Sequence, residues 1–382
     1  MDEPSNPVPR FTLKELLNIA SGRANADLSG LRQPSAIAEH IPYPFFALVG
    51  QREMKLALLL NLVNPAAGGV LLVGPRGTGK TTAVRALQNM LPQEPRSMCY
   101  YGCTEQDVEQ SGMDAVCPAC AKKFGQGEPL TTLAQVNLVE LPLNAELADI
   151  LGSRELDAGG QPYTLRSGLL HQADRNILYI DEVNLLPQDL IDSILDAAAQ
   201  GFYRVRRQNT SATFNARFVL IGSMNPEEGS LRPQILDRFG MRVFVRGLQD
   251  PQERLQAYND AAAYQRNPRD FSARWQHSEQ IAQTEIAIAR ERVRRVTLPT
   301  ALAQQGISTI QSLGIESLRA EISWFESAKA LAACDEREQV TVQDLRETAA
   351  MCLRLRRSSF IPKYFSNQQT EEDELAVALG KL

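Results

Sequence analysis

The sequence predicts an α/β fold, in which a parallel sheet with flanking helices is followed by an all-helical C-terminal region. Up to Asp250, short apolar runs typical of buried strands alternate with helix-like patterns, which favours a parallel sheet covered on both faces. A glycine-rich motif follows the first complete apolar run and leads into a helix-like pattern. After Asp250 the strand-like runs stop and only helix-like patterns continue.

The predicted elements follow one another in a regular order. Strand-like runs lie at 69–73, 135–141, 176–180 and 217–221. Helix-like patterns lie at 53–63, 81–90 and 187–199, and then at 251–263, 278–296, 318–333 and 342–357. Thr341 and Asp344 resemble a capping box at the start of the last helix.

These patterns divide the chain into four expected parts. They are an N-terminal extension (1–40), an α/β nucleotide-binding domain (41–250) with a cysteine-bearing insert (95–130), a helical connector (251–296) and a C-terminal helical domain (297–382). The boundary before the last part falls at Thr297-Leu298-Pro299.

Composition excludes several classes of protein. The 382 residues are 43% hydrophobic and 22% charged, which is ordinary for a globular chain. The net charge of −5 argues against nucleic acid as the main partner, and hence against a DNA-linked factor. No apolar run approaches the roughly 18 residues that a membrane span needs. The N-terminus shows no signal or transit pattern, so we expect a cytoplasmic protein.

The glycine-rich motif fits the P-loop pattern in full, and its place between a strand and a helix is the context that supports the match. Glycines allow backbone N–H groups to surround phosphates, the lysine reaches the β- and γ-phosphates, and the threonine hydroxyl binds Mg²⁺. The motif therefore predicts a nucleoside triphosphate site with bound Mg²⁺. Its residues are Gly74, Pro75, Arg76, Gly77, Thr78, Gly79, Lys80 and Thr81.

Two carboxylates follow the apolar run 176–180. Asp181 is placed to orient the Mg²⁺ ion, directly or through water, and Glu182 to polarise the attacking water. A surface pair after a core strand is the alternative, but the complete P-loop favours the catalytic interpretation.

Further candidates lie in or after the strand-like run 217–221. Asn225 lies just beyond it and is a candidate for holding the water near the γ-phosphate. Arg217, Arg238 and Arg319 are candidates for stabilising the charge that develops there. For each arginine, a solvated or salt-bridged role is the alternative.

At this point the chain resembles the magnesium chelatase subunit I branch of the AAA+ ATPases, over roughly residues 44–360. The P-loop alone indicates only a nucleoside triphosphatase. More specific are the segments LYIDEVNLL at 178–186, ARFV at 216–219, and NPEEGSLRPQ at 225–234 followed by LDRFG at 236–240.

The resemblance implies an AAA+ P-loop domain with a helical lid, and it implies roles for the arginines. Asn225 is similar to the sensor-1 residue, and Arg319 to the sensor-2 arginine of the lid. Arg217 and Arg238 are similar to arginines that act on the nucleotide of a neighbouring subunit. Each site would then be complete only at a subunit boundary, which implies a homo-oligomeric ring, expected to be a hexamer.

The resemblance also implies a function. The expected role is the ATP-hydrolysing motor that drives Mg²⁺ insertion into protoporphyrin IX in chlorophyll or bacteriochlorophyll biosynthesis. Two partners are implied, an AAA+/von Willebrand-type subunit and a large porphyrin-binding subunit. A MoxR-like remodelling ATPase that does not act on a porphyrin is the alternative, because the two classes share the nucleotide chemistry.

Four cysteines form two close pairs in the insert: Cys99, Cys103, Cys117 and Cys120. Thiolates with this spacing can close a tetrahedral, structural zinc site. Four reduced cysteines without a metal are the alternative, and the three-residue gap within the first pair keeps it open.

Overall fold

The computed structural model describes residues 41–155, 164–207 and 210–356. A five-stranded sheet has the order β11-β1-β10-β7-β4, and each neighbouring pair is parallel. Its strands are β1 (Val70–Val73), β4 (Leu138–Leu141), β7 (Ile177–Ile180), β10 (Val219–Met224) and β11 (Met241–Phe244). This sheet, with helices on both faces, confirms the predicted fold class.

Both faces of the sheet are buried. In β1, Val70 and Leu72 belong to one hydrophobic core, while Leu71 and Val73 belong to another. Successive side chains of a strand point to opposite faces, so the two cores lie on the two sides of the sheet. The first includes residues of α2 (Arg52–Val63), α12 (Gln276–Val293), α14 (Arg319–Cys334) and α15 (Val342–Leu353). The second includes residues of α7 (Leu169–Ala173) and α8 (Gln188–Gln200).

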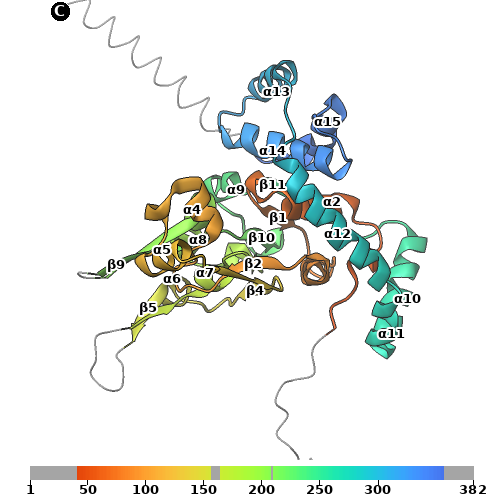
Figure 1. The fold of residues 1–382 in the computed structure, drawn as a ribbon. Coiled ribbons are helices and arrows are strands. Elements are labelled where there is room, and N and C mark those ends of the chain that lie inside the picture. The colour runs from red at the N-terminus through yellow and green to blue at the C-terminus, as the bar shows by residue number, and fades with distance from the viewer. Residues whose placement is uncertain (1–40, 156–163, 208–209, 357–382) are drawn as a thin grey trace, which may run out of the picture. The chain divides into compact units, whose positions relative to one another are not determined.

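The C-terminal part is helical, as predicted. Figure 1 shows α12 extending from the group α13 to α15 past α2 toward α10 and α11. The additional helices are α10 (Pro251–Arg266), α11 (Pro268–Ala273) and α13 (Thr300–Ser312). The predicted capping box is confirmed, because the Thr341 hydroxyl accepts from the Asp344 N–H while the Asp344 carboxylate accepts from the Thr341 N–H. Within the described residues, no helix has the length and apolar character needed to cross a membrane.

The connections contain structure that the sequence patterns did not predict. The insert lies between the paired strands β2 (Glu94–Ser97) and β3 (Thr131–Ala134), and it holds α4 (Glu105–Ser111) and α5 (Pro118–Gly125) where we expected little regular structure. Two more hairpins pair β5 (Gly152–Glu155) with β6 (Thr164–Ser167) and β8 (Phe202–Arg207) with β9 (Thr210–Asn215). The shorter helices are α3 (Lys80–Ala86), α6 (Leu147–Leu151) and α9 (Pro233–Arg238). Strand β11, α13 and these two hairpins were not predicted.

Candidate functional site

The P-loop connects β1 to α3, and its glycines occupy positions that a side chain would disturb. Gly77 and Gly79 have φ values of +77° and +87°, which favour glycine. A Cβ atom on Gly74 would lie 2.0 Å from the carbonyl oxygen of Val245. The loop conformation therefore depends on the glycines of the motif.

A cavity of 270 Å³ lies between this loop and the ends of two neighbouring strands. It brings together Lys80, Thr81, Asp181, Glu182 and Asn225, which are far apart in the sequence. The carboxyl ends of adjacent parallel strands meet at one edge of a sheet, and this explains the convergence. The lining residues are Arg76, Gly77, Thr78, Gly79, Lys80, Thr81, Thr82, Asp181, Glu182, Ser223, Met224 and Asn225.

Lys80 is buried at the base of the P-loop. Its Nζ atom donates hydrogen bonds to the carbonyl oxygens of Gly74 and Pro75, at 2.7 and 2.8 Å. Burial lowers the pKa of Lys80, and nearby carboxylates, Asp181 foremost, oppose this shift. The chain thus holds a lysine where its charge is poorly solvated, so an anion in the cavity would be a favourable neighbour.

Asp181 is fixed by hydroxyl groups. Its Oδ1 atom accepts from the hydroxyls of Tyr179, at 2.8 Å, and Ser223. Its Oδ2 atom accepts from the Thr81 hydroxyl at 3.3 Å. A carboxylate and a hydroxyl oxygen are ligands that suit Mg²⁺, so this pair fits the ion that accompanies nucleotide phosphates.

Tyr179 and Ser223 were not among the predicted site residues. Tyr179 lies inside β7, and its hydroxyl oxygen also lies 3.2 Å from that of Ser223. Burial raises the pKa of Tyr179, so it stays a neutral donor. The sequence signals were weak: one hydroxyl in an apolar strand, and one serine near the end of another.

Glu182 and Asn225 also line the cavity. Glu182 has a φ of +53°, and its backbone N–H donates to the Ser223 hydroxyl at 3.2 Å. The Glu182 Oε1 atom accepts from Arg76 at 3.1 Å. Asn225 is buried, and its side-chain oxygen accepts from the N–H of Glu227 at 3.3 Å. The left-handed backbone of Glu182, two residues after the end of β7, is a sparsely populated conformation of the kind that collects at functional sites.

The three candidate arginines do not line this cavity. Arg238 and Arg319 line a second cavity of 360 Å³. There Arg238 pairs with Asp196 at 2.8 Å, and Arg319 pairs with Asp237 at 3.3 Å.

Asp237 also holds the buried Arg356, at 2.6 Å. Burial alone would raise the pKa of Asp237, but the Ser317 hydroxyl and the charge of Arg356 outweigh it and lower that pKa.

Arg217 lies at a third place, where it pairs with Asp107 of the insert. It lines a cavity of 570 Å³ whose wall also includes Arg175, Arg290 and Arg294. In this arrangement each of the three arginines thus lies outside the P-loop cavity of its own chain.

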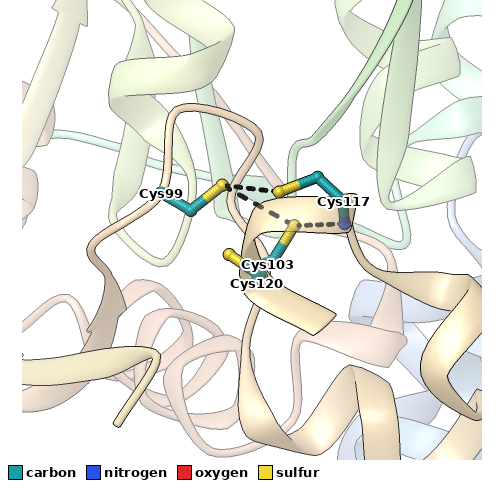
Figure 2. A group of neighbouring side chains, drawn as sticks. All are labelled: Cys99, Cys103, Cys117 and Cys120. Carbon is teal, nitrogen blue, oxygen red and sulfur yellow. Dashed lines mark hydrogen bonds between the residues drawn. The ribbon is translucent and has the colours of Figure 1, made fainter. Parts of the chain in front are cut away.

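The four cysteines of the insert converge. Their sulfur atoms all lie within 4.8 Å of one another, and Figure 2 shows them turned toward a common centre. The Sγ atom of Cys99 lies 3.7 Å from that of Cys103 and 3.6 Å from that of Cys117. Four sulfurs at about 2.3 Å from one tetrahedral metal would lie about 3.8 Å apart, which the measured separations approach.

Comparison with known proteins shows which families the chain resembles. An AAA domain family matches residues 64–228, and an AAA lid domain family matches residues 304–377. A relative named magnesium-chelatase subunit ChlI homolog, from Methanocaldococcus jannaschii, is 39% identical over 335 residues, covering 86% of this chain and 90% of the relative. Magnesium-chelatase subunit ChlI of a Nostoc species is 38% identical over 329 residues, covering 85% of this chain and 86% of that one.

A solved structure shares the fold. It is a putative ATPase from Cytophaga hutchinsonii with a TM-score of 0.54 and 19% identity, covering 82% of this chain and 84% of that one.

Proposed function

Because the chain belongs to the magnesium-chelatase subunit ChlI family of AAA+ ATPases, we propose that it is the ATP-hydrolysing motor of a magnesium chelatase. In this role it would drive Mg²⁺ insertion into protoporphyrin IX together with a von Willebrand-type AAA+ subunit and a large porphyrin-binding subunit. One observation carries the proposal: a complete phosphate and metal cradle in a chain that shares 37–39% of its residues with chelatase subunits along most of its length. A cytoplasmic location belongs to the proposal, because a chain with six unpaired cysteines suits a reducing compartment.

We infer the following roles for the cavity residues. The P-loop backbone and Lys80 would hold the β- and γ-phosphates, and Thr81 with Asp181 would hold Mg²⁺. The bound Mg²⁺ ion would neutralise part of the negative charge of the phosphates. Glu182 would accept a proton from the attacking water, and Asn225 would orient that water. Tyr179 and Ser223 would keep Asp181 in position through their hydrogen bonds.

The arginines support a ring. Arg217, Arg238 and Arg319 all lie outside the cavity of their own chain, so we propose that Arg217 and Arg238 reach the nucleotide of a neighbour. We further propose that Arg319, at the start of α14, acts from the lid side of the same boundary. A hexameric ring would place these groups at each subunit interface. Arginines supplied in this way contribute about 10³–10⁵ in rate in other nucleoside triphosphatases.

Mixed rings test the arginine roles. Arg217→Ala or Arg238→Ala subunits should be inactive alone but regain activity when mixed with Lys80→Ala subunits, because some boundaries then combine an intact P-loop with an intact arginine. Full activity of both arginine variants alone would show that these residues do not act in trans.

We also propose that the four cysteines bind one structural zinc ion. The support is their convergence to within 4.8 Å and the poverty of the insert in other core residues. A closed four-thiolate site leaves no open coordination position, so the ion would stabilise the insert rather than take part in hydrolysis. Purified protein should carry about one zinc per chain, and a metal-free protein with an intact insert would contradict this.

Reconstitution tests the chelatase proposal. The chain, the two partner subunits, Mg²⁺, ATP and protoporphyrin IX should yield magnesium protoporphyrin, and Lys80→Ala should abolish the product. ATP hydrolysis without any metal insertion in the complete mixture would instead favour a MoxR-like remodelling ATPase.

A further inference from the structure

The four-cysteine insert contacts the segment that carries Arg217. The loop between the first two cysteines lies against the end of β9: the carbonyl oxygen of Gly102 accepts from the Asn215 side chain at 2.8 Å, and that of Tyr101 accepts from the Asn215 backbone N–H at 3.2 Å. The ring of Tyr101 stacks on Phe214, with centroids 5.6 Å apart. The insert is therefore joined to the two residues that precede Ala216-Arg217.

The first helix of the insert supplies the partner of Arg217. Asp107 lies in the first turn of α4, and its Oδ1 atom accepts from the Arg217 guanidinium. Its Oδ2 atom accepts from the backbone N–H and the hydroxyl of Thr104, both at 2.9 Å, and from the Asn215 side chain at 3.3 Å. The side chain of Asp107 is 9% exposed, so these hydrogen bonds fix its orientation.

Arg217, in contrast, remains accessible. Its side chain is 41% exposed, and Asp107 engages one Nη atom. A guanidinium has five N–H donors, so the others can reach acceptors on another molecule. The guanidinium is planar and rigid, so a hydrogen bond to one edge restricts the orientation of the whole group. The buried carboxylate of Asp107 therefore limits the directions in which the free N–H groups of Arg217 can point.

We propose that Asp107 is a positioning residue for Arg217, and that the four-cysteine site holds Asp107 in place. This inference rests on the proposed role of Arg217 in trans. Cys103 immediately precedes Thr104, the residue that caps α4 and binds Asp107. The buried cluster of the insert contains five residues, two of them cysteines and one of them Val108 of α4, so the cysteine site and α4 share one small core. A change at the cysteine site would thereby alter the orientation of Arg217, the arginine proposed to act on the neighbouring subunit's nucleotide.

Asp107→Asn tests the link between the two residues, and Asp114→Asn is a matched control. Asp114 is an exposed carboxylate of the same insert, so both variants lose one negative charge. Asp107→Asn should lower kcat for ATP hydrolysis by the assembled protein about 10- to 100-fold, the order expected when a catalytic group is misplaced by about 1 Å. KM for ATP should not change, because the cavity of the same chain is intact. Asp114→Asn should match the unchanged protein, and both should keep their zinc.

Mixed rings separate positioning from a general structural role. Asp107→Asn subunits mixed with Lys80→Ala subunits should regain activity, as Arg217→Ala subunits do, because the Lys80→Ala subunits supply a correctly held arginine to an intact P-loop. Cys117→Ser/Cys120→Ser subunits should behave in the same way. Absence of recovery for Asp107→Asn, or a kcat at or above that of the unchanged protein, would overturn the inference.

The Arg217→Ala variant distinguishes failure of this inference from failure of the proposed function. If Arg217→Ala is fully active, the trans role itself is wrong and the inference falls with it. If Arg217→Ala is impaired and Asp107→Asn is not, the inference alone is overturned. If Asp107→Asn is impaired and the double cysteine variant is not, the link to the cysteine site is overturned.

Discussion

The nucleotide cavity and the four-cysteine insert belong to the same chain but are held in shape by different means. Asp181 and Asn225 follow strands that are buried on both faces, and Gly74 packs directly against Val245. The insert has a small cluster of its own: Cys103, Val108, Val116, Cys120 and Leu130. The cavity thus takes its geometry from the main cores, whereas the insert would owe comparable rigidity to the zinc ion that we propose. A change in the insert can therefore alter the position of Arg217, which the insert binds through Asp107, without unfolding the nucleotide cavity.

The largest expected effect concerns the cavity alone. Glu182→Gln should slow ATP hydrolysis about 10²- to 10⁴-fold, because the water loses its general base, while ATP binding and zinc content persist. Glu228→Gln is the matched control, since Glu228 also pairs with Arg76 but does not line the cavity. Equal turnover of the two variants would remove Glu182 from its proposed role.

The second expected effect concerns the insert alone. Cys117→Ser/Cys120→Ser should release about one zinc ion per chain and make residues 98–130 sensitive to protease, because metal binding there contributes folding free energy. Nucleotide affinity, measured by titration, should stay unchanged. Cys334→Ser, at an exposed cysteine of α14, should retain the zinc. A loss of nucleotide binding in the double variant would break the distinction between the two regions.

A smaller effect is expected where the insert meets the rest of the chain. Gly102 has a φ of +80°, and a Cβ atom there would lie 3.0 Å from the Cβ atom of Asn215. Gly102→Ala should destabilise this contact by about 1–2 kcal/mol from backbone strain, plus a contribution from the close approach. Gly127 has a φ of +76° and open space around it, so Gly127→Ala isolates the strain. Hydrogen exchange of the insert should rise more in Gly102→Ala, and equal rates would contradict the close contact.

The smallest effect is a pH dependence at the same junction. Asp174 accepts a hydrogen bond from the Arg217 N–H, and burial raises its pKa in spite of that bond. The folded chain therefore binds this proton more tightly than the unfolded chain, so the charged carboxylate lowers stability at neutral pH. That penalty shrinks as the pH falls through the raised pKa toward about 4.

Asp174→Asn removes the penalty and preserves the acceptor oxygen. Denaturant unfolding should show the variant more stable at pH 7 and the two proteins converging as the pH falls toward 4. The exposed Asp114→Asn should show no such convergence. A difference that grows on acidification would have the wrong sign for a buried carboxylate.

Sequence reasoning predicted the cavity well and the other contacts poorly, for a physical reason. The P-loop and the Asp181-Glu182 pair are local motifs, in which each residue lies near the next in the chain. Strand β11 was missed because Arg242 interrupts its apolar pattern. That arginine is fully buried and donates to the carbonyl oxygens of Leu236 and Phe239, of Cys352 in the last turn of α15, and of Arg354 just after that helix. Burial lowers its pKa to about 9.

The pairing of Asp107 with Arg217 was beyond any local pattern. The two residues are 110 positions apart, and each belongs to a segment whose placement depends on the tertiary fold. The cysteines lay between these extremes: their spacing predicted convergence, but four reduced thiols would have the same spacing. Only the three-dimensional arrangement showed that all four sulfurs lie within 4.8 Å of one another.

Because β2 pairs with β3, the rest of the domain does not depend on the length of the insert between them. Ser97 lies directly opposite Thr131 in this antiparallel hairpin, so the chain leaves and re-enters the domain at adjacent points. A two-residue turn of the type that closes β-hairpins could join the same strands and preserve their register. The hairpin therefore predicts that a short turn can replace the cysteine-bearing segment between Ser97 and Thr131. We expect a chain shortened in this way to keep its nucleotide cavity and to lose the contacts of the insert with Phe214, Asn215 and Arg217.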